Sequence, residues 1–131
     1  MTVTELTKKF TELESHIAEE KGDFAFFALF MREEVPNRWD LMVAAPWASG
    51  DTQDTVAYFV EQIKARLGAQ MLINLSRIVV IDSQHAAVQD LNREIQIEHG
   101  RVEVRDRDFF GLTIKHAYII TSKLLPVTVR W

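Results

Sequence analysis

Two segments of this chain are apolar on both faces of the strands that they predict, and this feature limits the folds that the chain can adopt. From Phe24 to Met31 apolar side chains occupy both alternating sets of positions, and from Arg77 to Asp82 β-branched residues do the same. Because such strands lie in sheets that are covered on both sides, usually by helices, the pattern favours a layered fold of helices and strands. We therefore predict two buried faces for the first segment and a central place in the sheet for the second.

Helical periodicity precedes the first of these segments. Thr2 and Glu5 fit a capping box, and apolar residues then recur at steps of four, three and four from Leu6 to Ile17. This pattern predicts an amphipathic helix that ends near Gly22.

A hairpin is predicted after that helix. The turn residues Pro36 and Asn37 separate two apolar runs, of which the second covers residues 39–45. Asp40, near the start of this second run, is expected to pair with Arg38 or to point into a cleft.

Two further helices are predicted, one before and one after the second β-branched segment. Asp51 provides a start signal for the earlier helix, and Gly68 closes it. Asp82 or Ser83 is expected to cap the later helix, which we predict to end before His99.

The end of the chain predicts two more strands. Val102 and Val104 alternate with charged residues, which is typical of an edge strand with one solvated face. A last apolar strand covers residues 117–121, and the tail from Leu124 to Trp131 fits either another edge strand or a segment docked on the surface. We predict a single compact domain over residues 1–131, of class α/β or α+β, with a mixed sheet of about five strands, three helices and the order α-β-β-α-β-α-β-β.

Composition excludes several classes of function. The chain has no cysteine, so disulfides, thiolate zinc sites and thiol catalysis are ruled out. Its 15 basic and 19 acidic side chains give a net charge of −4, which disfavours a nucleic-acid partner. Because no apolar run reaches the roughly 18 residues that would span a bilayer, and no signal segment is evident, we expect a cytoplasmic protein without a membrane partner. No phosphate-loop, zincin, hydrolase or EF-hand motif is present, and the sequence indicates no cofactor.

The predicted ligand site lies between two loops. If the strand ending near Ala45 and the one starting near Arg77 are parallel, the loops that follow them open at the same edge of the sheet, where ligands of such folds bind. Each loop runs into a helix N-terminus, whose free N–H groups attract anions. We therefore predict a cleft for a small anionic ligand; the alternative is that the polar residues only cap the helices. The side chains concerned are Trp47, Ser49, Asp51, Asp82, Ser83 and His85.

Asp106 and Asp108 are the candidate metal ligands. Residues two apart share a face of a regular strand, so the two carboxylates could together hold a divalent cation. The Gly-Ser pair that nucleotidyltransferases carry upstream of such an acidic pair is missing, and the E-x-K that nucleases need on a strand occurs only at residues 19–21, at a helix end. The alternative is a charged loop without a metal.

These observations leave two classes of function. The first is a non-catalytic binding or protein-interaction module, whose partner is another protein or a second copy of the chain paired through exposed edge strands. The alternative is a small metal-dependent phosphoryl-handling enzyme, nucleotidyltransferase-like or nuclease-like, with its cleft near residues 46–51 and 82–85. Because no complete set of catalytic residues is recognisable, we favour the first class.

Overall fold

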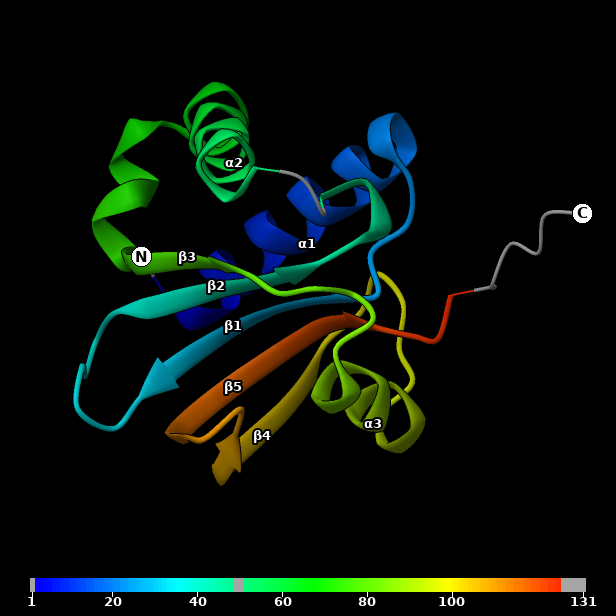
Figure 1. Cartoon of the computed structure of the whole chain (residues 1–131). Coiled ribbons are helices and arrows are strands. Elements are labelled where there is room, and N and C mark those ends of the chain that lie inside the picture. The colour runs from blue at the N-terminus through cyan, green and yellow to red at the C-terminus, as the bar shows by residue number, and fades with distance from the viewer. Residues whose placement is uncertain (1, 49–50, 126–131) are drawn as a thin grey trace, which may run out of the picture.

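The chain forms one mixed five-stranded sheet with three α-helices, as seen in a computed structural model that describes residues 2–48 and 51–125 (Figure 1). The predicted class and element order are confirmed, and the fold is of the α+β class. The helices are α1 (Val3–Lys21), α2 (Thr52–Leu67) and α3 (Ala86–Glu94), with short 3₁₀ helices η1 (Pro46–Ala48) and η2 (Ala69–Asn74). The strands are β1 (Phe26–Arg32), β2 (Trp39–Ala44), β3 (Leu75–Val80), β4 (Val102–Phe109) and β5 (Leu112–Ser122), in the spatial order β3-β2-β1-β5-β4.

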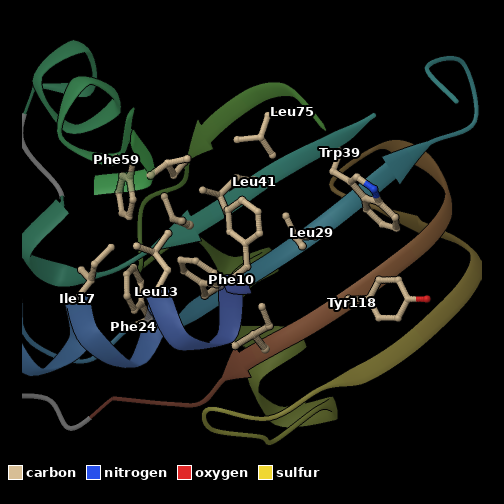
Figure 2. Close-up of a cluster of buried hydrophobic side chains, with 14 of the residues drawn as sticks. Phe10, Leu13, Ile17, Phe24, Leu29, Trp39, Leu41, Phe59, Leu75 and Tyr118 are labelled. Atoms are coloured by element: carbon tan, nitrogen blue, oxygen red, sulfur yellow. The ribbon is translucent and has the colours of Figure 1, made fainter. Parts of the chain in front are cut away.

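Helices cover both faces of the sheet. The larger core lies between the sheet and the pair α1 and α2, and Figure 2 shows side chains of these helices meeting those of β1 and β2. A smaller core lies on the other face, under α3 and the turn between β4 and β5. Along β1, Phe27 and Leu29 belong to the larger core while Phe26, Ala28 and Phe30 belong to the smaller one. All five are fully buried, so the predicted burial of both faces of this segment is confirmed.

The predicted pairing of the first three strands is also confirmed. β1 and β2 form an antiparallel hairpin, and β2 pairs with β3 in parallel, with α2 in the connection between them. The carboxyl ends of β2 and β3 therefore meet at the same edge of the sheet. The side chain of Thr2 accepts a hydrogen bond from the Glu5 backbone N–H, as the capping box requires.

The prediction that the segment from Arg77 to Asp82 is a central strand is wrong. β3 lies at one outer side of the sheet and β4 at the other (Figure 1), while β1 occupies the middle between β2 and β5. The apolar residues Ile78, Val79, Val80 and Ile81 are consequently only partly buried. Apolar residues on both faces of a strand indicate that helices cover both faces of the sheet. They do not indicate whether another strand lies beside it in the sheet, so an edge strand can have the same pattern.

The cap of α3 also differs from the prediction. The N-cap is His85, whose Nδ1 accepts a hydrogen bond from the Ala87 N–H at 3.1 Å, and neither Asp82 nor Ser83 has that role. The carboxylate of Asp82 instead accepts from the Gln84 N–H at 2.8 Å, because the chain makes a turn before it enters the helix. The helix ends at Glu94, before His99 as predicted, but residues 95–97 do not continue it, because Ile97 forms an isolated antiparallel bridge with Ser122.

The edge strand predicted around Val102 and Val104 is confirmed as β4. The question of an additional strand in the tail falls mainly on residues 126–131, which lie outside the described residues. None of the described helices has the length and apolar character needed to cross a membrane.

Candidate functional site

Trp47, predicted to line the ligand cleft, packs against the larger core. Its indole lies 5.4 Å from the Phe24 ring, 6.0 Å from Tyr58 and 5.9 Å from Phe59, measured between ring centroids. Its Nε1–H donates to the carbonyl oxygen of Gly22 at 3.0 Å. The half-buried side chain therefore joins the end of α1 to α2, and its polar atom is already satisfied.

Three of the other predicted site residues make local hydrogen bonds. Asp51 caps α2 by accepting from the Gln53 N–H at 2.8 Å, while Asp82 and His85 bond to backbone N–H groups in the turn and at the cap of α3. These bonds are the ones expected if the polar residues only cap the helices. Ser49 lies outside the described residues, and the binding role of all four remains a prediction.

Ser83 lines a cavity at the predicted edge of the sheet. The cavity has a volume of about 250 Å³ and lies between α3 and the segments that flank β1 and β5. Ser83 is 7% exposed, and within the described residues its hydroxyl has no hydrogen-bond partner. The other lining residues combine amide, guanidinium and aliphatic groups: Ala25, Gln84, Gln89, Asn92, Arg93, Leu124 and Leu125.

The two candidate metal ligands lie on the exposed side of β4. Asp106 has a φ of 49°, in the left-handed region, so the strand departs from regular β geometry at this residue. Among the described residues no third histidine or carboxylate joins the pair in a group that could hold a metal ion. The role of the two aspartates as metal ligands stays a prediction.

The outer side of β3 is a feature that sequence reasoning missed. The Ile81 N–H donates to the Val43 carbonyl at 2.8 Å, so this residue directs its backbone groups toward β2. Because these directions alternate along a strand, the N–H and C=O groups of Ile78 and Val80 point away from β2. No described strand pairs with that side of β3.

The opposite edge of the sheet is protected from such pairing. β4 carries charged side chains along its length, and the left-handed conformation of Asp106 distorts it. Hydrogen bonds from Arg105 and His116 lower the pKa of Glu103 to about 2, so this carboxylate stays ionised at neutral pH. β3 has one charged residue, Arg77, and no such distortion beyond it.

A buried ion cluster lies at the start of β3. The carboxylate of Asp40, 2% exposed, accepts a hydrogen bond from the Nε–H of Arg32 at 2.7 Å and forms an ion pair with Nε of Arg77 at 3.1 Å, and among the described residues it has no ion pair with Arg38. A bulge places both Ser76 and Arg77 opposite Asp40, and Arg32 also donates to the Ser76 hydroxyl at 3.3 Å. Hydrogen bonding to Asp40 raises the pKa of Arg32 further above its ordinary value.

This arrangement leaves part of Arg77 available for a partner. Its side chain is 42% exposed and pairs with the carboxylate of Asp40, yet none of its guanidinium nitrogens has a hydrogen-bond partner among the described residues. Arginine donors of this kind bind carboxylates in pairs of hydrogen bonds. The start of the open edge therefore offers a recognition group for an acidic side chain.

A second buried carboxylate, Glu14 of α1, has a structural role. It accepts from the Thr121 hydroxyl at 2.8 Å and contacts Nδ1 of His99, whose backbone N–H in turn donates to the Thr121 hydroxyl at 3.1 Å. These bonds join α1 to the end of β5. The sequence contained a signal for this site, because Glu14 lies four residues after Phe10 and three before Ile17, on the apolar face of the helix.

No protein-family model, curated protein or solved structure gives a significant match to this chain.

Proposed function

We propose that this protein is a protein-interaction module that binds an extended segment of polypeptide along the open side of β3. The observation that carries the proposal is the contrast between the two edges of the sheet. β4 is charged and distorted, whereas β3 presents unpaired backbone groups beside a run of β-branched residues. Folds normally protect their edge strands against pairing, so an unprotected edge is a candidate for functional pairing.

Strand addition would use both the backbone groups and the apolar side chains that β3 exposes. The outward N–H and C=O groups of Ile78 and Val80 supply main-chain hydrogen bonds, which give affinity with little dependence on sequence. Ile78 and Val80 pack partly against the larger core and Val79 and Ile81 against the smaller one, so an added strand would bury more apolar surface on both faces. Arg77 would add a preference for an acidic residue at one end of the ligand.

The proposal can be tested with Ile78→Pro and its matched control Ile78→Ala. Both variants lose most of the side chain, but only the proline also removes the outward N–H, without disturbing a bond to β2. Peptides selected from a random displayed library on the wild-type protein should bind Ile78→Ala and should lose at least about tenfold in affinity, or about 1.4 kcal/mol, on Ile78→Pro. Isothermal titration calorimetry measures the difference.

Nuclear magnetic resonance shows where on the protein the peptide binds. The amide signals of Ile78 and Val80 should shift most on peptide addition, because their N–H groups face the ligand. Peptides that bind both variants equally, or that shift residues elsewhere in the molecule, would contradict the proposal.

A second candidate function is binding of a small polar ligand in the cavity beside Ser83. The observation that favours it is that Ser83, 7% exposed, lines that cavity and that its hydroxyl makes no hydrogen bond to the described residues. The hydroxyl can therefore donate to and accept from a ligand in the cavity. Arg93 at the cavity wall would favour an anionic ligand.

Thermal shift measurements with inorganic phosphate, nucleotides and sugar phosphates test this second candidate. A ligand at about 100 times its Kd should stabilise the fold by about 2.7 kcal/mol and raise the Tm by several degrees. Ser83→Ala should abolish the rise. Thr2→Ala serves as the control, because losing the cap of α1 should lower the Tm and leave the ligand-induced rise intact. A flat response to all three ligand classes would remove this candidate.

A further inference from the structure

We infer that the strand added at β3 is β3 of a second copy of this chain. The two strands would pair antiparallel about a two-fold axis and join two five-stranded sheets into one continuous sheet. This inference rests on the proposed function, since it names the occupant of the same edge.

The charges along the edge are self-complementary only in the antiparallel direction. The exposed segment begins with Arg77, continues with four apolar residues and ends with Asp82. In an antiparallel pair the positive start of one strand lies near the negative end of the other, whereas a parallel pair would place like charges together. With Val79 on the two-fold axis, Arg77 lies opposite Ile81 and Asp82 opposite Ser76, so the two charges are close along the ladder but on opposite faces of the sheet, and they attract each other without a direct ion pair.

The positions of the outward backbone groups define the register. With the axis at Val79, Ile78 of each copy lies opposite Val80 of the other, and these are the residues whose N–H and C=O groups are unpaired. Each opposed pair exchanges two hydrogen bonds, so all the outward groups of both residues are satisfied in both copies. Val79 then faces its own counterpart as a pair without hydrogen bonds, with Cα atoms about 4.5 Å apart.

Side-chain contacts support the same arrangement. Ile78 and Val80 share one face of the sheet, so the pairing would extend the larger apolar core across the axis. Apolar β-branched pairs directly opposite each other stabilise an antiparallel ladder. No charged residue of β3 meets an identical charge, because the two copies of Arg77 lie at opposite ends of the paired segment.

The absence of cysteine from the chain makes a direct test possible. In Val79→Cys the introduced thiol has no competitor, and the predicted Cα separation matches what a disulfide needs. Under mild oxidation this variant should form a disulfide-linked dimer. Ile73→Cys is the matched control: it is 68% exposed, on η2 next to β3, yet off the predicted axis, so it should remain largely uncrosslinked.

Sedimentation of the unmodified protein gives an independent readout. The wild type and Ile78→Ala should show twice the chain mass of 15.1 kDa at high concentration, and Ile78→Pro should lose the dimeric species. If Ile78→Pro fails to fold, hydrogen exchange of the wild type replaces it: the Ile78 and Val80 amides should become protected as concentration rises.

The outcomes separate this inference from the proposed function. A wild type that stays monomeric, with no cross-link through Val79→Cys, would overturn self-pairing, and selected peptides that still shift Ile78 and Val80 would leave strand addition in place. A dimer that persists in Ile78→Pro would place the interface elsewhere and overturn the inference. Where self-pairing holds, a selected peptide should dissociate the dimer, because both occupy the same edge.

Discussion

Replacing Asp40 with alanine should lower the free energy of unfolding by about 3 to 5 kcal/mol, the cost of breaking a buried ion pair by removing one partner. The carboxylate is almost fully buried, accepts two hydrogen bonds from the guanidinium of Arg32 and forms an ion pair with Arg77. Without it, Arg32 keeps its charge in a largely buried position with only an exposed carboxylate and a hydroxyl as partners. Urea denaturation followed by circular dichroism measures the loss.

Glu34→Ala is the matched control for this prediction. Glu34 bonds the same guanidinium of Arg32 at 2.9 Å, but its side chain is 73% exposed. Exposed ion pairs contribute only about 0 to 1 kcal/mol, so this variant should unfold almost as the wild type does. Equal effects of Asp40→Ala and Glu34→Ala would show that the cluster around Asp40 contributes little to stability.

Phe30→Ala should destabilise the fold by about 3 to 5 kcal/mol, as expected for a large-to-small change in a closed core. The ring is fully buried on the central strand and stacks on Phe109 at 4.9 Å between centroids, with Phe26 at 5.9 Å and Phe110 at 6.3 Å. Alanine would leave a cavity where β1 meets the turn between β4 and β5. Scanning calorimetry should record a Tm lower by roughly 10 to 20 °C.

Phe110→Ala gives the comparison for Phe30→Ala. Phe110 belongs to the same cluster, but it lies in the turn and is only partly buried. Its replacement should therefore lower the free energy of unfolding clearly less than Phe30→Ala does. Phe30→Leu should fall between the two, because it retains most of the apolar volume. A loss below about 1 kcal/mol for Phe30→Ala would contradict the description of this core as closely packed.

The two loops of the predicted ligand site differ in their surroundings. Ser83 lines a cavity at the predicted edge of the sheet. This edge could be predicted because the helix between β2 and β3 indicates that the two strands are parallel, as they are. Trp47, predicted to line the same cleft, packs against the larger core, and its part in ligand binding stays a prediction. Its contacts with Phe24 and Phe59 depend on the tertiary structure, so the residues around Trp47 in the sequence do not indicate them.

The sequence by itself determined the local elements of this protein. The capping box at Thr2, the hairpin between β1 and β2 and the burial of both faces of β1 depend on residues close together in the chain. Their signals are periodicity and turn chemistry, which act over a few residues and so can be read without knowing the fold.

The tertiary structure alone decided which elements became neighbours. Glu14 meets His99 and Thr121, and Asp40 meets Arg77 rather than the nearby Arg38, because the fold brings distant segments together. The same is true of β3. Its apolar pattern records helices above and below, but a strand has a second pair of neighbours in the plane of the sheet, where backbone groups and not side chains make the contacts. Since every residue type except proline carries the same backbone donor and acceptor, the sequence could not show that one side of β3 is open.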